Sequence, residues 1–224
     1  MTALAVLVFI AAALIFDYYH SRHAMPKVAV HRVSPPSTAP RPLPTFINGF
    51  HVPQNLLFHI GHTWALSESP NLVRVGMDDF ASRVFGKVEK IQLPQRGQWV
   101  RQGQKIVAMD RDGSTYEMLS PIEGTITDVN EAVVNHPDIA RTDPYGEGWL
   151  MKVNAPDAKT SFRNLLGGSL ARWWTEDAAS RLQRRMPGVL AGATAQDGGL
   201  AAENLTSALS KGDRELLAHE FFLT

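Results

Sequence analysis

The side chains that most invite a chemical interpretation are three histidines close together in the chain: His51, His59 and His62. His59 and His62 have the i, i+3 spacing found in some metal sites, and a bound metal needs convergent ligands supported by neighbouring carboxylates or carbonyls. No acidic residue accompanies the histidines before Glu68. We therefore expect the histidines to pack in the structure, and we expect no metal site.

Carboxylates form the second candidate group, because a pair of them can act as general acid and general base. Asp78, Asp79 and Glu147 are the relevant residues. Asp78 stands where it can cap a helix, and the others lie in turn or helix-start contexts. The chain also lacks a nucleophile elbow, a phosphate-binding loop and a dinucleotide fingerprint. It contains no cysteine, which excludes thiol catalysis and disulfides. The sequence predicts no catalytic residues and no enzyme activity.

The overall charge is balanced, with 22 basic and 22 acidic side chains. No global field therefore recruits nucleic acid, and nothing points to a small-molecule substrate. Residues 55–156 contain short runs with a period of two divided by turn residues, which is typical of a small, mainly β barrel or sandwich. Within this part, the apolar spacing over Met77–Phe85 predicts a short helix.

One predicted turn has a direct chemical consequence. Asp112-Gly113 separates two β-rich runs, and glycine accepts the positive φ that a two-residue type I′ hairpin turn requires. A tight turn of this kind gives Gly113 a purely structural reason to be there.

Several motifs of the β-rich part occur in an order that matches a known family. They are Gly61-His62-Thr63-Trp64, Val75-Gly76-Met77-Asp78-Asp79-Phe80-Ala81, Ser120-Pro121-Ile122-Glu123-Gly124, Val129-Asn130-Glu131 and Asp143-Pro144-Tyr145-Gly146-Glu147-Gly148-Trp149-Leu150. This part of the chain resembles the H protein of the glycine cleavage system. The resemblance implies a lipoyl/biotinyl-type barrel-sandwich hybrid.

The resemblance also implies where a cofactor would be attached. The family carries lipoate on a lysine at a hairpin tip, and counting back from Pro121 places that position at Gly113. Glycine has no amine, so we expect no lipoyl amide and no cofactor. Lys87, Lys90 and Lys105 are poor substitutes, because lipoyl ligases recognise a lysine displayed at the hairpin apex.

The first 24 residues predict a membrane anchor. The segment from Thr2 to Phe16 is almost entirely apolar, and with the two tyrosines that follow it approaches the length needed to span a bilayer. Tyr18 and Tyr19 stand where an interfacial aromatic belt belongs, followed by Arg22. Because basic residues follow the apolar run and none precede it, we expect the N-terminus outside and the C-terminal domain in the cytoplasm.

We expect the remaining segments to be linkers and helices that flank the barrel. Residues 25–54 form a proline-rich linker or strap, and residues 157–187 form an amphipathic helical segment. Residues 188–224 form a linker and a C-terminal helical arm that is too short to be stable alone. Adjacent helical positions point about 100° apart, so Trp173 and Trp174 cannot share one stripe. We expect Trp173, Trp174, Phe221 or Phe222 at a protein–protein contact.

These expectations combine into one functional prediction. The sequence predicts a non-catalytic, membrane-anchored accessory subunit that stabilises a larger integral membrane protein complex, photosynthetic or respiratory, from its cytoplasmic side. Membrane lipid and the host complex are its expected partners. Two alternatives stay open. The first is a membrane-tethered carrier that bears a lipoyl-like group on an unusual lysine, and the second is an efflux-type adaptor.

Overall fold

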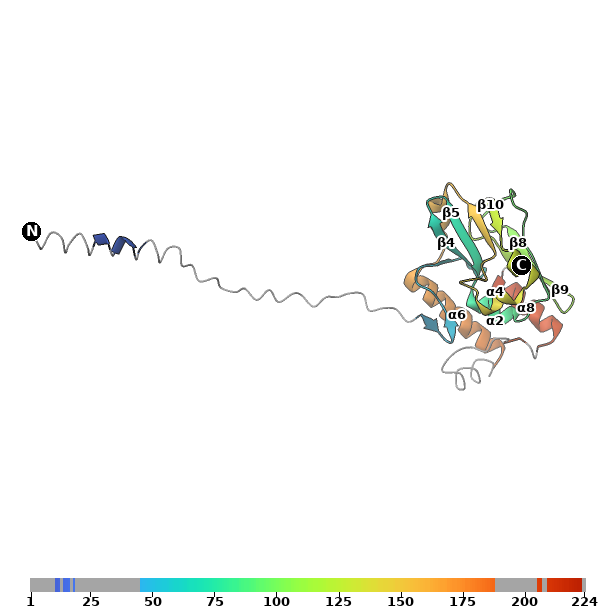
Figure 1. The fold of residues 1–224 in the computed structure, drawn as a ribbon. Coiled ribbons are helices and arrows are strands. Elements are labelled where there is room, and N and C mark those ends of the chain that lie inside the picture. The colour runs from blue at the N-terminus through green and yellow to red at the C-terminus, as the bar shows by residue number, and fades with distance from the viewer. Residues whose placement is uncertain are drawn as a thin grey trace, which may run out of the picture. The chain divides into compact units, whose positions relative to one another are not determined.

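The computed structural model describes residues 45–187, 205–206 and 209–222, together with positions 11–12, 14–16 and 18 (Figure 1). The chain divides into two units, Met1–Arg41 and Pro42–Thr224. Of the first unit, Tyr18 is helical and exposed, whereas Tyr19, Arg22 and most of the predicted anchor and strap lie outside the described residues. No helix in the described part of the chain is long and apolar enough to cross a bilayer.

The second unit contains the mainly β body that the sequence predicts. Its largest sheet has six antiparallel strands in the spatial order β3-β4-β5-β11-β10-β7. The strands are β3 (Leu57–Phe58), β4 (Thr63–Ser69), β5 (Leu72–Met77), β7 (Trp99–Val100), β10 (Gly124–Val129) and β11 (Met151–Asn154). Alternate residues of β5, such as Val73 and Val75, are fully buried, which follows from the period of two along a strand with one face on the core.

A second sheet has three strands, β6 (Lys90–Gln92), β8 (Lys105–Arg111) and β9 (Ser114–Leu119), in the order β6-β8-β9. β8 and β9 form a hairpin whose last pair is Arg111 with Ser114. The two residues between them have positive φ, 50° at Asp112 and 73° at Gly113. This is the backbone conformation of the two-residue turn predicted from the Asp-Gly dipeptide. A third, two-stranded sheet pairs β1 (Phe46–Ile47) with β2 (Phe50–His51).

Six helices lie in the described part of this unit: α2 (Asp79–Phe85), α3 (Glu131–Asn135), α4 (Asp138–Thr142), α5 (Ala158–Phe162), α6 (Gly168–Arg185) and α8 (Lys211–Phe222). The helix predicted over Met77–Phe85 is α2. Its N-terminus is capped by Asp78, whose carboxylate accepts a hydrogen bond of 2.8 Å from the backbone N–H of Ala81. The predicted helical segment 157–187 contains α5 and α6, and the predicted arm contains α8.

The core is shared between the sheets and the C-terminal helices. Figure 1 shows α8 beside the β8–β9 hairpin, and α8 makes its main packing contacts with β9. Val75, Met109 and Ile126 from the strands belong to the same buried cluster as Leu182 of α6 and Phe222 of α8. The last described residues of the chain therefore complete the core that the strands begin.

Candidate functional site

The apex of the β8–β9 hairpin contains Gly113, the position that the sequence analysis matched to the family's cofactor-bearing lysine. Gly113 is exposed, and a Cβ added to it would meet no atom within 4 Å. Space for a side chain is therefore available. What disfavours one is the left-handed backbone, which costs a residue with a Cβ about 1 kcal/mol.

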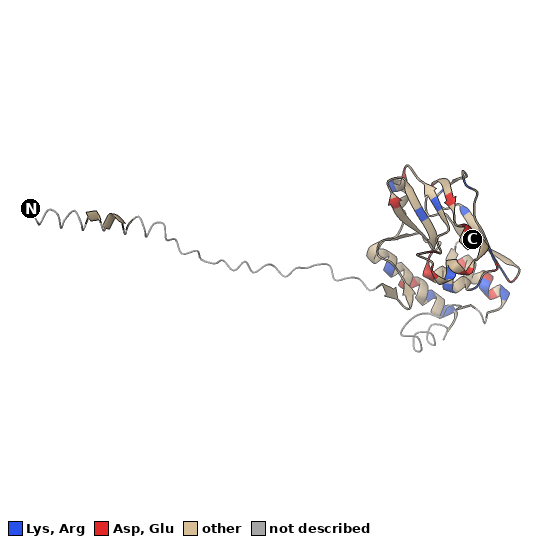
Figure 2. Cartoon of the chain, viewed as in Figure 1, with Lys and Arg blue, Asp and Glu red and all other residues tan. Residues whose placement is uncertain are grey.

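Helix α8 contacts each of the three residues at this apex. Lys211 Nζ donates to the Gly113 carbonyl oxygen (3.1 Å), Arg214 pairs with the Asp112 carboxylate (3.0 Å), and Ser114 Oγ donates to the Glu215 carboxylate (2.8 Å). Figure 2 shows basic and acidic residues along this helix. Lys211, Glu215 and Asp112 are about half exposed, whereas the Arg214 side chain is largely enclosed. The apex is thus held from one side by a charged helix of the same chain.

Arg111, the residue before the turn, is buried. Its guanidinium donates to the carbonyl oxygen of Phe85 and to the Thr206 hydroxyl at 3.1 Å, and its Nε contacts the Asp112 carboxylate at 3.2 Å. Arg111 therefore connects the hairpin to the end of α2 and to the segment that precedes α8. The sequence analysis missed this role. The only signal was the inward register that Arg111 shares with Val107 and Met109 on β8.

A small cavity lies between the hairpin and α8. Its volume is about 10 Å³, close to the space of one water molecule, and Arg111, Tyr116, Arg214 and Phe222 are among the residues that line it. Tyr116 Oη and Arg214 Nε are buried and have no hydrogen-bond partner among the described residues. The cavity thus lies beside both of these side chains, at the contact between α8 and the hairpin.

Beyond this cavity, the C-terminal end of α8 enters an aromatic cluster. The Phe222 ring stacks on Phe85 with centroids 4.1 Å apart, and the Phe221 ring lies 5.1 Å from Phe80. Phe221 and Phe222 are 2% and 0% exposed. This corrects the expectation that they lie at a contact with another protein: the surface that covers them is that of their own barrel.

His62 is at the centre of the same cluster. Its ring stacks on Phe80 at 4.3 Å and lies tilted against Trp174 at 4.4 Å, and its Nδ1 is 2.8 Å from the Asp78 carboxylate. His62 therefore packs in the core, which is the role that the sequence analysis favoured for it. His59 is nearby and accepts a hydrogen bond of 3.1 Å from the Gly61 N–H. Burial lowers the pKa of His59, and the neighbouring His62 lowers it further.

The remaining candidate ligands and carboxylates take part in local hydrogen bonds and ion pairs. Asp79 accepts from the His51 N–H at 2.8 Å and pairs with Arg83 at 2.8 Å. Burial raises the pKa of Asp79, and Arg83 opposes this shift. Glu147 is exposed, and its N–H is held by Asp143. The described residues include no group of three or more His, Cys, Asp or Glu side chains arranged to hold a metal.

The two tryptophans of α6 are separated as the helical geometry predicts. Trp174 is 8% exposed and packs on His62, whereas Trp173 is 64% exposed. Of the four residues expected at a protein–protein contact, Trp173 is therefore the one that lies on the surface.

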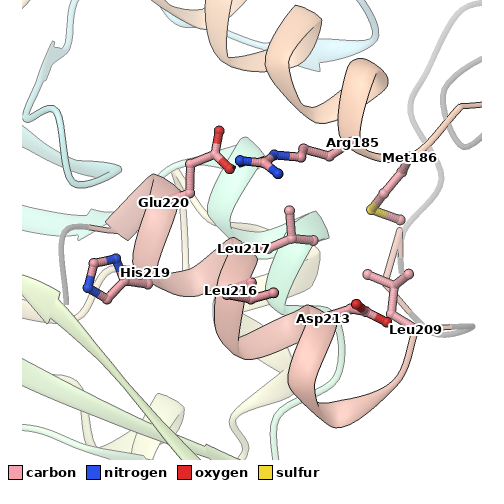
Figure 3. Close-up of a pocket in the computed structure, with 8 residues that line it drawn as sticks. All are labelled: Arg185, Met186, Leu209, Asp213, Leu216, Leu217, His219 and Glu220. Atoms are coloured by element: carbon pink, nitrogen blue, oxygen red, sulfur yellow. Dashed lines mark hydrogen bonds and ion pairs between the residues drawn. The ribbon is translucent and has the colours of Figure 1, made fainter.

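An open groove of about 640 Å³ lies between the end of α6 and the outer face of α8 (Figure 3). Met186, Leu209, Leu216 and Leu217 supply its apolar lining. Arg185 and Glu220 form an ion pair of 3.0 Å across one end of it. Nothing in the groove resembles a reaction centre, because its polar side chains are already paired or widely spaced.

Comparison with known proteins identifies relatives of the barrel. The family model described as "Glycine cleavage H-protein" matches residues 56–175, more than half of the chain. The chain is 35% identical over 130 residues to a probable glycine cleavage system H protein 2 of Sulfurisphaera tokodaii, covering 56% of this chain and 86% of that one. It is 34% identical over 107 residues to a glycine cleavage system H protein of Mycobacterium avium, covering 48% and 81%.

A solved structure is also similar. The crystal structure of a glycine cleavage system H protein from Mycobacterium marinum aligns with a TM-score of 0.49 and 27% sequence identity, covering 57% of this chain and 98% of that one. The family match ends within α6, so the second half of α6 and all of α8 lie beyond it.

Proposed function

Because the chain belongs to the glycine cleavage H-protein family, we propose that it is a non-lipoylated member that uses the family barrel as a binding scaffold. In this proposal it is a non-catalytic, membrane-anchored accessory subunit, and it stabilises a larger membrane protein complex from the cytoplasmic side. The observation that carries the proposal is the hairpin apex. The count back from Pro121 assigns the family's lysine position to Gly113, and α8 contacts Gly113 and the residue on each side of it.

The residues at the apex do not fit a lipoyl group. An amide to lipoate requires a primary amine, and neither Asp112 nor Gly113 has one. Lys105 lies at the base of the hairpin, where its Nζ is paired with Glu117 at 2.7 Å. We therefore assign no lipoyl-dependent transfer chemistry to this apex. In this proposal the barrel serves as a surface that binds the host complex.

One observation favours a second candidate, a lipoyl-like carrier. Lys211 brings an amine to the apex from α8, with Nζ 3.1 Å from the Gly113 carbonyl oxygen. This amine is about half exposed. It is presented by the first turn of a helix rather than by a hairpin tip, which is the reason we rank carrier function second. The tight two-residue turn also disfavours the efflux-type adaptor, because such adaptors usually carry a long helical hairpin at that tip.

The membrane part of the proposal rests on the sequence. The apolar run before residue 17, the tyrosines after it and the basic residues that follow support a single anchor with the barrel in the cytoplasm. Trp173 supports a contact with the host complex, because a largely exposed tryptophan is typical of an interface anchor.

The proposal is tested by gentle solubilisation of the native membrane. We expect the protein to co-migrate with a larger assembly and Trp173→Ala to reduce that association, while Leu170→Ala, an exposed apolar control on the same helix, has a smaller effect. A protein that stays monomeric in native membranes would overturn the subunit proposal.

A further inference from the structure

We propose that α8 is a steric shield on the hairpin apex, which keeps lipoyl-attaching enzymes away from residues 112–114 and leaves the same residues open to small molecules. The proposal rests on the proposed function, because it takes Gly113 as the family's lysine position. It goes further, since it attributes the absence of carrier chemistry to two independent features of this chain. One is the missing amine, and the other is the covered apex.

The first step is the position of α8 against the hairpin. The N-terminal end of the helix makes a polar contact of 2.8–3.1 Å with each of the three apex residues. The pairs are Lys211 with Gly113, Arg214 with Asp112, and Glu215 with Ser114. At hydrogen-bond distance no other polypeptide fits between the helix and the apex. An enzyme can therefore approach the apex only from the sides that α8 leaves free.

The second step is that α8 is a fixed part of the folded chain. Phe221 and Phe222, at its C-terminal end, are 2% and 0% exposed. Both belong to the main buried cluster, which also contains Met109 of β8 and Leu182 of α6. An enzyme that pushed the whole helix aside would have to open this core. The shield therefore stays in place when a partner approaches the hairpin.

The third step is that the shield selects by size. Gly113 itself is exposed, and a Cβ added to it would meet no atom within 4 Å. An open groove of about 420 Å³ between β9 and α8 reaches the apex, with Thr115 and His219 among its lining residues. A small reagent therefore has access to a side chain at position 113. An enzyme must also accommodate the residues that flank this position, and α8 covers one side of them.

The contacts at the apex can be removed without the apolar anchor of the helix. Phe221 follows Lys211 by ten residues, which is about 15 Å along a helix axis. Lys211 and Glu215 are about half exposed, and ion pairs at exposed positions stabilise a structure only weakly. Serine at the three contacting positions is too short to reach the hairpin and lowers helix propensity. We therefore expect these substitutions to loosen the N-terminal end of α8 while the phenylalanines hold the remainder.

Enzymatic lipoylation of an introduced lysine tests the shield. A lipoate–protein ligase joins the carboxyl group of lipoate to the lysine Nζ as an amide, and ATP is cleaved to AMP and pyrophosphate. Three full-length variants are compared by the initial rate of adduct formation at position 113, measured by peptide mass mapping. They are Gly113→Lys alone, Gly113→Lys with Lys211→Ser, Arg214→Ser and Glu215→Ser, and Gly113→Lys with Glu220→Gln. The last is the matched control, because it removes the ion pair of α8 with Arg185, away from the apex.

We expect the serine variant to be lipoylated at position 113 at least about tenfold faster than Gly113→Lys alone, because three weak polar pairs together correspond to roughly one factor of ten in the opening of the helix end. The Glu220→Gln control should react at the rate of Gly113→Lys alone. Equal rates in the serine variant and in Gly113→Lys alone, or no adduct in either, would overturn the shield.

Chemical acylation separates shielding by size from a change in the reactivity of the lysine. The N-hydroxysuccinimide ester of acetate transfers an acetyl group to an amine and releases N-hydroxysuccinimide. We expect this small reagent to acylate the introduced lysine at the same rate in all three variants, relative to the exposed Lys159 of the same chain. A slower reaction in Gly113→Lys alone than in the serine variant would refute the size selectivity.

Two further measurements keep the outcome interpretable. Thermal melting shows whether each variant retains the folded barrel, and Arg214→Ser alone on the Gly113→Lys background repeats the comparison if the triple replacement unfolds it. Lipoate on a lysine of the native chain would refute the scaffold function, whereas the shield is refuted only by the rates at position 113. The two failures are therefore distinguishable.

Discussion

The replacement of Phe222 by alanine probes the contact that attaches α8 to the barrel. The ring is fully buried, stacks on Phe85 at 4.1 Å and lies at 5.5 Å, edge-on, from His62. Truncation of a buried phenylalanine to alanine typically costs about 3–5 kcal/mol, from the lost transfer energy and the cavity left behind. We therefore expect Phe222→Ala to weaken docking of α8 by a factor of about a hundred or more.

Native-state amide hydrogen exchange is the suitable assay, because it reports α8 and the strands separately. The amides of α8 should lose protection equivalent to the full cost of the truncation, about 3–5 kcal/mol, and the amides of β5 should lose less. Leu216→Ala is the matched control: it lies on the same helix but is 71% exposed, so its effect should remain within about 0.5 kcal/mol. Similar exchange in the two variants would refute the assignment of Phe222 as an anchor. An equal loss of protection in α8 and β5 would show that α8 does not open independently.

Three further predictions concern the apex, pH and topology. Gly113→Lys should lower the unfolding free energy by about 1 kcal/mol in chemical denaturation, because the backbone at position 113 is left-handed. The variant should not support glycine cleavage in a reconstituted assay, and measurable activity would contradict this. The folded-state pKa of His59 lies below its ordinary 6.5, so between the two pKa values the unfolded chain binds more protons than the folded chain. The unfolding free energy should therefore fall as pH drops through that window. His59→Gln should remove this pH dependence in unfolding titrations, and an unchanged pH dependence would exclude His59 as its source. Protease added to sealed right-side-out membranes should leave the barrel intact; digestion there would reverse the proposed orientation.

Local features of the barrel were predictable because they depend on residues close in the chain. Asp112-Gly113 predicted the hairpin turn because few dipeptides accept two successive positive φ angles. Asp78 predicted the start of α2, because a side chain that accepts a backbone hydrogen bond favours helix initiation at the next residue. The separation of Trp173 from Trp174 followed from helical geometry alone.

The docking of α8 was not predictable in the same way. The two phenylalanines showed that the C-terminal helix needs an apolar partner, but periodicity does not identify the partner. The sequence interpretation named them among the candidates for a contact with another protein, and the structure places them against Phe80 and Phe85 of the same chain. Arg111 was missed for a related reason. A buried arginine depends on acceptors distant in sequence, here the Phe85 carbonyl and the Thr206 hydroxyl.

The intact mass of the protein isolated from its native source tests the central claim most directly. Gly113 has no amine at the apex, so we predict that the intact mass contains no lipoyl-sized increment. Peptide mapping should then find every lysine unmodified, including Lys211, which lies beside the apex. A lipoyl-sized addition on Lys211 or any other lysine would contradict the scaffold function and establish the chain as a carrier.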